Sequence, residues 1–531
     1  MTTFLPVLAV AAGIVYLSRD ILHFFQLESY QFHGYFKTLR RQWKRVCLPF
    51  ALFAGMIFLC FLCKLLWKSG PVWLQVILDL ITAGLIAAAA YQIDKLFIQI
   101  QRQKKPFVVT ARVKRLYGGY AIVVLLFAAV LLSSHLPLWL FLPALAVCAP
   151  FLLALGALLM LPVEKGIQQL YFNDARKRLL ASPGLIRIGI TGSYGKTSVK
   201  FILHTILSEK YLVLSMPSSF NTPMGLTRII RERLEPAHQV FIGEMGARHT
   251  KDIRVLCRLV HPQIGILTSV GPQHLDTFKT LENIKNTKYD LIRSLPSDGF
   301  AVFSDDKGIV RELWEKTNMP KAIAGEPGDS LWADHIELSS AGSTFDLHIG
   351  DRVIPGCQTK LLGKYNIQNI VAACACAVHL GLSDEQIVRG IAKVQPVEHR
   401  LQLLTQGNQI TVIDDSFNSN PRGSEAALDV LAGFPGRRII VTPGMVELGR
   451  EEEEYNRRFG TKMASCVDMA YLVGKKHTKP IHEGLLSAGF APENVFVCSD
   501  LNEAVALLNQ KMQKGDVVLY ENDLPDHYDE K

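Results

Sequence analysis

The sequence contains no cysteine framework. Its ten cysteines are scattered through 531 residues, and the CxxC pair Cys60 and Cys63 lies in an apolar run without a second pair to complete a zinc site. Cys374 and Cys376 fall in an alanine-rich stretch that is typical of a helix. These positions argue against a disulfide-stabilised or zinc-finger protein and indicate buried, reduced thiols in a reducing cytosol.

Two other features are missing. The extreme N-terminus has neither a basic region nor a small-residue cleavage site, so a cleaved signal peptide is not expected. The net charge of +9 is not arranged as a basic stripe interleaved with aromatic residues, which argues against nucleic acid as a partner. Much of the excess lies in short loops between apolar runs, where membrane topology explains it.

Apolar residues are concentrated at the N-terminal end. Five apolar runs occupy residues 4–18, 47–67, 72–92, 119–134 and 137–161. A helix needs about 20 apolar residues to cross a bilayer, so the second, third and fifth runs qualify and the first and fourth are short. We therefore expect an α-helical transmembrane domain of about five helices over residues 1–162. Asp79 is the only acidic residue within a run, and such a lone acid faces water or a neighbouring helix more often than it marks a transport path.

Lysine and arginine are distributed unevenly between the loops that join these runs. Residues 19–46 carry six of them and residues 93–118 carry seven, whereas the turns at 69–71 and 133–136 are almost uncharged. Because basic loops stay in the cytoplasm, five spans place the N-terminus outside and everything after Pro162 inside the cell. The sequence therefore predicts a multi-pass protein of the cell membrane with a cytoplasmic C-terminal part.

The remainder of the chain has the pattern of a soluble α/β protein. Runs rich in β-branched residues predict strands at 185–191, 239–244, 264–268, 410–414, 438–441 and 517–520. The stretches between them are mostly of helical length, which favours parallel sheets built from strand–helix–strand units. A proline and a charged cluster at Pro396–Arg400 separate two sets of strands, so we predict domains at 180–395 and 396–531.

The clearest motif follows the first of these strands and precedes a helix predicted from Val199. It consists of Thr191, Gly192, Ser193, Tyr194, Gly195, Lys196, Thr197 and Ser198. Glycines allow backbone N–H groups to face phosphate oxygens, and the helix N-terminus favours negative charge. Lys196 would neutralise the β- and γ-phosphates, and the hydroxyl of Thr197 would hold Mg²⁺. We predict that residues 192–198 bind ATP together with Mg²⁺.

This motif departs from the usual P-loop, which has a glycine five residues before the Gly-Lys pair, where this chain has Ile190. The shorter Thr-Gly-x-x-Gly-Lys-Thr form resembles that of the Mur ligases and folylpolyglutamate synthases. Further segments repeat the resemblance in the expected order, at 219–225, 244–247, 271–275, 363–369, 399–400, 414–421 and 444–449. Over residues 184–520 the chain is most similar to the Mur ligases that add D-alanyl-D-alanine. This resemblance implies a P-loop central domain and a Rossmann-like C-terminal domain.

The resemblance also implies a metal site. Glu244 and His274 stand where the family has metal ligands, and each follows a predicted strand on the side of the sheet where ligands collect. Lys288 stands in the register of a lysine that related ligases carbamylate with CO₂. A carbamate would turn that cation into an anionic oxygen ligand beside Mg²⁺, together with Thr197.

For the nucleotide, the resemblance assigns residues on both sides of the predicted domain boundary. Asn366 and Asn369 retain the asparagines that the family uses near the adenine. Arg400 matches an arginine that reaches ATP when the domains close, and with Lys196 it would stabilise charge on the transferring phosphoryl group. Asp415 would meet the ribose hydroxyls or order the hinge.

Two regions depart from the family pattern. The UDP-sugar-binding N-terminal domain is absent, with apolar runs in its place, and residues 521–526 replace the late Lys-Gly-Ser-Arg segment near the incoming amine. Tyr365 and Asn456 each stand where histidine is usual, and Asp290 stands where glutamate is usual. Both substrate-recognition regions differ, so the resemblance implies the reaction more directly than the substrates.

The sequence therefore predicts an ATP-dependent ligase of peptidoglycan precursor metabolism, in which a carboxylate is activated as an acyl-phosphate and attacked by an amine. The expected substrates are a muramoyl-peptide-like acceptor and an amino acid or a dipeptide such as D-alanyl-D-alanine. A lipid-linked peptide or polymer acceptor is the alternative within the same chemistry. A P-loop-powered membrane transporter and an inactive scaffold of wall synthesis are alternatives of another class. Cell-wall synthesis proteins are possible partners.

Overall fold

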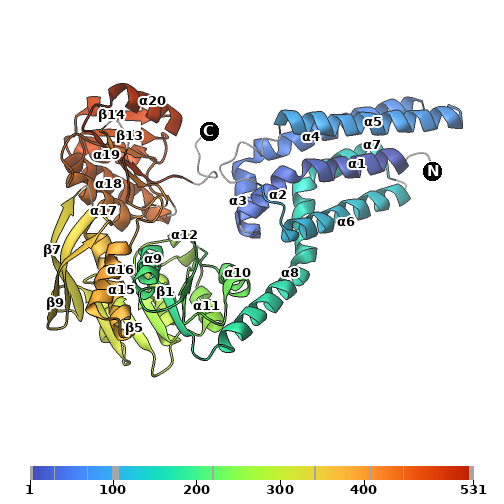
Figure 1. The fold of residues 1–531 in the computed structure, drawn as a ribbon. Coiled ribbons are helices and arrows are strands. Elements are labelled where there is room, and N and C mark those ends of the chain that lie inside the picture. Colours follow the sequence, from blue (N-terminus) through green and yellow to red (C-terminus); the bar gives the residue numbers. More distant parts are fainter. Residues whose placement is uncertain are drawn as a thin grey trace. The chain divides into compact units, whose positions relative to one another are not determined.

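The computed structural model describes residues 4–28, 30–67, 70–97, 107–134, 136–217, 220–339, 342–405, 409–417, 419–446 and 448–524. Part of the second basic loop (98–106) and the motif residues Ser219, Asn418 and Glu447 lie outside this description. Contacts divide the chain into two compact units, Met1–Gln169 and Leu170–Lys531, which run from blue to teal and from there to red in Figure 1.

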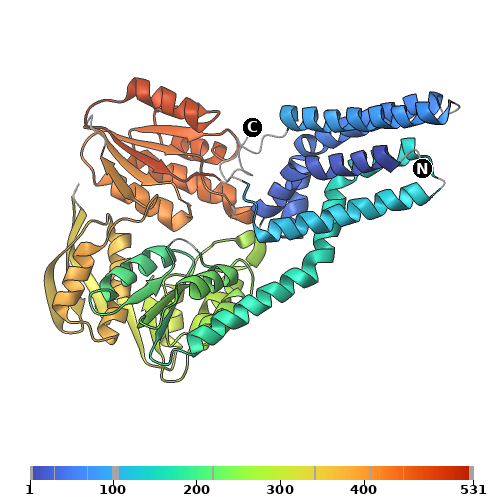
Figure 2. The same cartoon turned by 45° about the vertical axis from the view of Figure 1, so that its right-hand side comes forward.

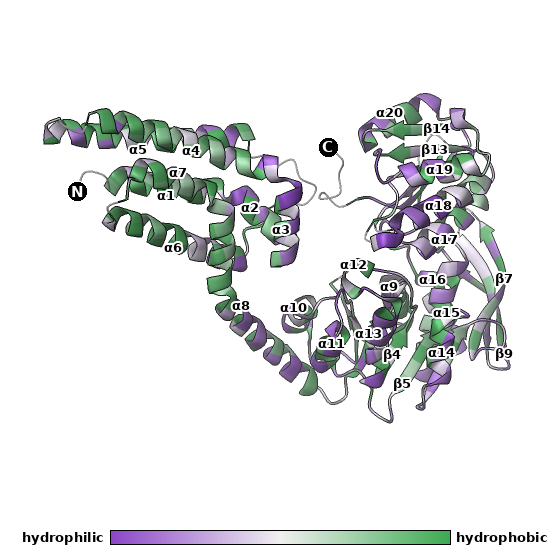
Figure 3. Ribbon diagram, turned by 180° about the vertical axis from the view of Figure 1, so that it is seen from behind, coloured by the Kyte–Doolittle hydropathy of each residue, from purple (hydrophilic) through white to green (hydrophobic). Residues whose placement is uncertain are grey.

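The first unit consists of helices, most of them apolar. They are α1 (Phe4–Leu17), α2 (Arg19–Leu27), α3 (Phe32–Arg41), α4 (Trp43–Leu66), α5 (Val72–Phe97), α6 (Ala111–Ser133), α7 (Leu138–Val147) and α8 (Ala149–Leu180). Five helical segments of the described chain are long and apolar enough to cross a membrane: α1 together with α2, α4, α5, α6 and α8. Figure 3 shows α4 to α6 hydrophobic along most of their length, whereas α8 changes to hydrophilic toward its C-terminal end.

Helix boundaries differ from the predicted runs at two places. The first helical segment is longer than the run 4–18, because α2 continues α1 after a single turn residue. The run 137–161 is not one helix, because it breaks at Cys148, and Pro150 in the first turn of α8 has no N–H with which to extend α7. α8 then continues unbroken to Leu180, beyond the predicted end of the transmembrane domain.

Several ion pairs join helices of this unit, among them those of Asp79 and Glu164. Asp79 of α5 is buried and pairs with Lys64 of α4, so this acid faces a neighbouring helix. Glu164 of α8 accepts hydrogen bonds from Arg115 Nε at 2.5 Å and from Arg115 Nη2 at 3.1 Å. Charged groups among apolar helices are costly unless they are paired. These contacts therefore serve helix packing and give no support to a transport path.

The second unit begins with a nine-stranded sheet in the order β2-β3-β1-β4-β5-β6-β7-β8-β9. Its strands are β1 (Ile186–Thr191), β2 (Val213–Ser215), β3 (Val240–Glu244), β4 (Ile264–Leu267), β5 (Phe300–Ser304), β6 (Lys321–Gly325), β7 (Leu331–Ser339), β8 (Gly342–Ile349) and β9 (Arg352–Thr359). The strands from β2 to β7 pair in parallel, and β8 and β9 extend the sheet beyond β7 as an antiparallel ribbon.

Helices cover both faces of this sheet. They are α9 (Lys196–Leu207), α10 (Pro223–Arg233), α11 (Asp252–Val260), α12 (Leu275–Phe278), α13 (Leu281–Arg293), α14 (Ile309–Glu315), α15 (Lys364–His379) and α16 (Asp384–Lys393). One apolar core lies between the sheet and α9, α15 and α16, and a second lies between the other face and α10, α11, α13 and α14. Burial on both faces explains why the parallel strands read as continuous β-branched runs.

A second sheet has the order β10-β11-β15-β12-β13-β14. Its elements are β10 (Gln402–Thr405), β11 (Thr411–Asp415), α17 (Pro421–Ala432), β12 (Arg438–Thr442), a 3₁₀ turn (Gly449–Glu451), α18 (Glu452–Cys466), β13 (Met469–Val473), α19 (Lys479–Ser487), a second 3₁₀ turn (Pro492–Asn494), β14 (Val495–Cys498), α20 (Leu501–Lys511) and β15 (Val517–Glu521). All its strand pairs are parallel except β10 with β11, and α17 to α19 cover one face while α20 covers the other (Figure 2).

The six strands predicted from the sequence are all present, as β1, β3, β4, β11, β12 and β15, each within two residues of its predicted bounds. Parallel pairing is confirmed for both sheets. The antiparallel ribbon was not expected. Its strand β7 does not alternate cleanly between apolar and polar residues, because its pairing with β8 shifts register between Asp334 and Glu337.

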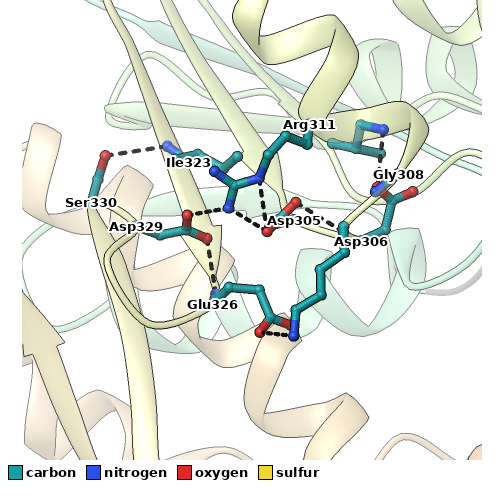
Figure 4. A network of polar contacts seen from close by, with 10 residues as sticks. Asp305, Asp306, Gly308, Arg311, Ile323, Glu326, Asp329 and Ser330 are labelled. Carbon is teal, nitrogen blue, oxygen red and sulfur yellow. Dashed lines mark hydrogen bonds and ion pairs between the residues drawn. The ribbon is translucent and has the colours of Figure 1, made fainter.

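A buried ion-pair network supports the middle of the nine-stranded sheet (Figure 4). The side chains of Asp305, after β5, and Asp329, after β6, are 0 % and 1 % exposed, and both pair with Arg311 Nη2 of α14 at 2.5 Å. We expect Arg311→Ala to destabilise the fold by about 3 kcal/mol, because it leaves two buried carboxylates without a cation. Thermal unfolding of the detergent-solubilised chain measures this effect.

Arg352 provides the matched control. It pairs with Asp384 at 3.1 Å on the surface, where both side chains are more than a third exposed. Exposed pairs contribute under about 1 kcal/mol, so Arg352→Ala should leave the unfolding temperature almost unchanged. Equal shifts for the two variants would show that the network of Arg311 is not a structural support.

Candidate active site

The predicted phosphate loop connects buried strand β1 to the N-terminus of α9. Gly195 has a φ of +80°, and a Cβ there would lie 2.7 Å from Asn369 Oδ1. Only glycine is accommodated at this position. The loop is also held from the segment after β4, since Ser193 N donates to Ser269 O at 2.9 Å and Tyr194 N donates to Ser269 Oγ at 2.7 Å. The fold therefore fixes this backbone in the strand-to-helix setting that the sequence predicts.

Lys196 is the first residue of α9, and its amino group folds back over the loop. Nζ donates to Gly192 O at 2.6 Å and to Ser193 O at 3.0 Å. Burial lowers the pKa of Lys196 to about 8, while attraction by Glu244 opposes the shift and repulsion by Arg400 adds to it. An amine beside the N-terminus of a helix is placed to meet an anionic oxygen.

Glu244 ends β3 next to this loop and is 0 % exposed. Its Oε1 accepts hydrogen bonds from Thr197 Oγ1 at 3.0 Å and from Asn221 Nδ2 at 3.2 Å. Its Oε2 forms an ion pair with Lys200 Nζ at 3.3 Å. The structure thus brings together two of the predicted metal ligands, Thr197 and Glu244, with an amide and a second lysine around them.

Lys200 and Asn221 were not predicted as individual site residues. Lys200 lies one helical turn after Lys196, and its position four residues later was the available signal, since i and i+4 share a helix face. Its side chain is 0 % exposed, which a lysine tolerates only when it is paired. Asn221 lies in the segment 219–225 that carried the resemblance, but its contact with Glu244 depends on the fold.

Lys288 lies on α13 and is 1 % exposed. Burial lowers its pKa well below the usual range, and repulsion from Lys196 adds to the shift, while Asp252 and Glu244 oppose it. Lys288 is therefore influenced by the charges of Lys196 and Glu244, two other residues of the predicted site. Burial favours the neutral amine of a lysine, which is a nucleophile.

His274 lies on the segment after β4, with a φ of +51°, directly before α12. A cavity there is lined by Pro272, Gln273, His274, Ser419, Asn420, Val446 and Leu448. His274 therefore lies opposite loops of the second sheet. Its grouping with Glu244 around one metal ion stays a prediction.

Asn366 and Asn369 lie in the first two turns of α15, beside the loop. Asn366 Nδ2 donates to Leu362 O at 2.9 Å. Asn369 is 3 % exposed, and its Nδ2 has no hydrogen-bond partner within the described part of the chain. A buried amide without a partner calls for a ligand or water. It is adjacent to Gly195, so the donor is available next to the phosphate loop.

Arg400 and Asp415 belong to the segment that carries the second sheet. Arg400 lines a small cavity together with Ser198 of α9 and Asn366 of α15, two helices that cover the nine-stranded sheet. Burial raises the pKa of Asp415 to about 6, opposed by its hydrogen bond from Leu401 N at 3.1 Å and by the charge of Arg400. Predicted nucleotide-binding residues from the two sheets thus meet around one cavity.

The structure describes residues 521–524 of the segment that replaces the family's Lys-Gly-Ser-Arg, and Pro525 and Asp526 lie outside the description. Glu521 ends β15, is 0 % exposed, and accepts hydrogen bonds from Ser419 Oγ and, at 2.6 Å, from Thr442 Oγ1. Burial raises the pKa of Glu521 to about 7, against the effect of these two hydroxyls. Asn522 Nδ2 donates to Gly444 O at 2.6 Å. Glu521 and Asn522 thus belong to an internal hydrogen-bond network, and Ser419 of this network also lines the cavity at His274.

Comparison with known proteins agrees with this geometry. The family model described as Mur ligase middle domain matches residues 190–377, and the one described as Mur ligase, glutamate ligase domain matches 399–520. UDP-N-acetylmuramoyl-tripeptide--D-alanyl-D-alanine ligase of Mycobacterium bovis is 31% identical over 364 residues, which are 64% of this chain and 71% of that protein. The chain belongs to the Mur ligase family.

Solved structures support the same assignment. MurF from Acinetobacter baumannii matches this Mur ligase with a TM-score of 0.61 and 26% identity, over 68% of this chain and 78% of that one. MurF from Thermotoga maritima in complex with ADP matches the fold with a TM-score of 0.60 at 24% identity, over 67% of this chain and 80% of that one. This Mur ligase is an ATP-dependent ligase that forms an amide bond and releases ADP.

Proposed function

We propose that this Mur ligase joins the carboxylate of a muramoyl-peptide-like acceptor to D-alanyl-D-alanine or another amino acid. The relatives from Mycobacterium bovis and Escherichia coli are both named for a muramoyl-tripeptide and D-alanyl-D-alanine. The observation that carries the proposal is the group of Lys196, Thr197 and Glu244 at the carboxyl ends of two adjacent parallel strands, β1 and β3. Ligands of open α/β sheets bind at this edge.

The residues around Glu244 fit a hard divalent cation. The hydroxyl of Thr197 and the carboxylate of Glu244 are 3.0 Å apart, and oxygen ligands are those that Mg²⁺ prefers. We assign Thr197 and Glu244 to Mg²⁺, with His274 and a carbamylated Lys288 as further ligands. When bound, the ion neutralises phosphate charge.

For ATP, residues 192–198 act as a P-loop whose N–H groups and helix dipole receive the phosphates. Asn366 and Asn369 face the adenine side, supported by the buried, unpaired Nδ2 of Asn369. Asp415 contacts the ribose or holds the hinge, and Arg400 reaches the nucleotide from the second sheet.

The chemistry proceeds in two steps. A carboxylate oxygen of the acceptor attacks the γ-phosphorus, the bond to the β–γ bridging oxygen breaks, and ADP leaves. The amine then attacks the acyl carbon and loses a proton, and the tetrahedral intermediate expels inorganic phosphate. Lys196 and Arg400 stabilise the oxygens on which negative charge grows, and the positioning of the reactants supplies much of the remaining acceleration.

We also propose three domains: a transmembrane domain over 1–162, a central ATP-binding domain over 180–395, and a Rossmann-like C-terminal domain over 396–531. The two separate sheets, which Pro396–Arg400 divides, support the second boundary.

Thiol labelling in intact cells tests the proposed topology, with a cytoplasmic ligase and an external N-terminus. In a background where the exposed Cys63 and Cys148 are serine, an impermeant maleimide should label Ser134→Cys and spare Glu232→Cys. The reason is that the basic loops hold the ligase side in the cytoplasm. Permeabilised cells serve as the control, since both positions must then react. Labelling of Glu232→Cys from outside the cell would show that the ligase part is external and that the proposed orientation is wrong.

Turnover with matched acceptors tests the proposed substrates. The full chain in nanodiscs receives ATP, D-alanyl-D-alanine and the same muramoyl peptide, linked either to UDP or to a membrane lipid. We expect ADP release only with acceptor and amine together, and faster turnover of the lipid-linked form, because sharing a bilayer raises the effective concentration. Equal turnover of the UDP-linked form would show that the apolar helices only anchor the enzyme to the membrane. ADP release at the same rate with and without the amine would favour the transporter alternative. The absence of ADP release would favour the alternative of an inactive scaffold.

A further inference from the structure

A cluster of aspartates and histidines lies on the antiparallel ribbon at the edge of the nine-stranded sheet. One carboxylate oxygen each from Asp334 and Asp346 and one ring nitrogen of His335 lie within 4.8 Å of one another. His335 Nδ1 is 3.3 Å from Asp334 Oδ1 and 3.0 Å from Asp346 Oδ2. His348 Nε2 approaches the same Asp334 Oδ1 at 2.9 Å. Neither the family motifs nor the proposed ligase chemistry uses these residues.

The strand register places like charges against each other. Asp334 of β7 and Asp346 of β8 are direct partners across the antiparallel pair. Like charges at directly opposite positions destabilise a sheet. The arrangement is favourable only with a positive charge between the two carboxylates, and the cluster surrounds that position with ring nitrogens.

A β-bulge turns a second ligating group toward the aspartates. Successive residues of a regular strand point to opposite faces, so His335 would point away from Asp334. Here the pairing shifts register between Asp334 and Glu337, and His335 has a φ of +47°. The bulge thereby places the imidazole on the same side as the carboxylate that precedes it, which is a known use of bulges.

Neighbouring groups hold two of the four side chains in place. Asp346 Oδ1 accepts a hydrogen bond from Gly356 N of β9 at 2.7 Å, which leaves Oδ2 directed at His335. His348 stacks on Trp332 with ring centroids 3.6 Å apart and planes 11° from parallel. Supporting contacts of this kind orient metal ligands.

We propose that Asp334, His335 and Asp346 bind Zn²⁺, with His348 holding Asp334 in place. Carboxylate oxygens and neutral imidazole nitrogens are ligands that Zn²⁺ takes at about 2.0–2.2 Å, and three protein ligands leave a fourth position for water. Tetrahedral ligands at such distances are about 3.3 Å apart, close to the 3.3 Å and 3.0 Å that separate His335 Nδ1 from Asp334 Oδ1 and from Asp346 Oδ2. The His335 side chain is 78% exposed and His348 is 16% exposed, so the ion enters from solvent and His335 closes over it.

The ion would fasten β7 to β8 and, through Asp346 and Gly356, to β9. It would compensate the facing carboxylates and stabilise the ribbon that ends this sheet. Because no residue assigned to ATP or Mg²⁺ lies on β7 or β8, we expect its occupancy to be independent of ligase activity.

Zinc titration of the full chain, purified without a histidine tag, tests the site. Calorimetry should show one Zn²⁺ per chain that binds at the cluster. Asp346→Asn, which removes a ligand, and His348→Gln, which removes the ring that orients Asp334, should each weaken that binding by about tenfold or more. Cu²⁺ serves as an optical probe, because an ion bound by Asp334 lies near the Trp332 ring, which stacks on His348, and quenches its fluorescence. Subtracting the signal of Trp332→Phe isolates that quenching.

Asp351→Asn is the matched control, because Asp351 is an exposed aspartate in the turn between β8 and β9. It removes the same charge from the same ribbon and should leave Zn²⁺ affinity unchanged. Far-ultraviolet circular dichroism and ADP release should be alike in all variants, which excludes unfolding as the cause of lost binding. If Zn²⁺ binds the wild type no better than it binds Asp346→Asn, or if Asp351→Asn loses as much affinity, the cluster is only a set of histidine–aspartate ion pairs and the proposal is wrong.

Discussion

Lys196→Ala should lower ADP formation by about a thousandfold, to the background of the assay, while the chain still folds and inserts into membranes. The Lys196 amine lies over the phosphate loop, 2.6 Å from Gly192 O and 3.0 Å from Ser193 O, so it is already at the position where phosphate oxygens must arrive. Its removal takes away positive charge at a helix N-terminus without changing a packed apolar contact. Steady-state ADP release, with acceptor and amine saturating, measures the effect.

Lys393→Ala is the control for this prediction. Lys393 ends α16 in the same domain, but its side chain is 62% exposed and pairs with Glu209 on the surface. Its replacement should leave turnover within about twofold, since such a surface pair contributes little. Loss of activity in both variants would indicate a general effect of removing lysine charge. Full turnover by Lys196→Ala would show that this loop is not the nucleotide site.

The sequence could predict the residues that local structure brings together. Lys196 and Thr197 start a helix directly after a buried strand, so a short stretch of chain already defines their positions. Glu244 ends a second β-branched run, and the carboxyl ends of adjacent parallel strands meet at one edge. For these residues, the order of strand and helix along the chain was sufficient to predict that they share a site.

Residues whose role depends on tertiary contacts could not be predicted in this way. A lysine inside a helix is ordinarily solvated, so the burial of Lys200 against Glu244 could not be predicted from the sequence. The unpaired Nδ2 of Asn369 depends on how closely α15 approaches Gly195. Parallel pairing was predictable from helix-length connections, but the antiparallel ribbon was not, because the bulge at Asp334 interrupts its alternation.

The apolar helices show the same division between local and tertiary information. Hydropathy predicted their number and approximate positions. The break at Cys148 depends on one missing N–H, that of Pro150, within a run that is apolar throughout. A lone acid such as Asp79 cannot be classified from sequence, because its partner Lys64 lies on another helix. Long apolar runs therefore predict spans better than they predict where one helix ends.

Lys288→Ala should reduce turnover by about a hundredfold or more, and short carboxylates such as acetate or propionate should restore activity better than short amines do. The reason is that the amine of Lys288 is expected to act as a carbamate. Lys288 is 1 % exposed and lies within the electrostatic influence of Lys196, so an ammonium there is doubly unfavourable. Burial lowers its pKa well below the usual range, which favours the neutral amine that attacks CO₂.

The reaction forms a bond between the lysine nitrogen and the carbon of CO₂ and releases one proton, which leaves an anionic carbamate. That charge would be attracted by Lys196 instead of repelled, and its oxygens would join those of Thr197 and Glu244 around Mg²⁺. Carbon-13 NMR of the wild-type chain in ¹³CO₂-enriched buffer should show one carbamate signal that is absent from Lys288→Ala, and removal of CO₂ should slow ADP release.

Lys285→Ala separates this effect from loss of any lysine on α13. Lys285 lies one turn earlier on the same helix and pairs with Glu282 at 2.9 Å on the surface. It should keep both the carbamate signal and turnover, because its ammonium is already neutralised by an exposed partner. Unchanged turnover of Lys288→Ala would contradict the prediction, and so would rescue by amines alone, because an amine could replace the lysine cation but not an anionic metal ligand.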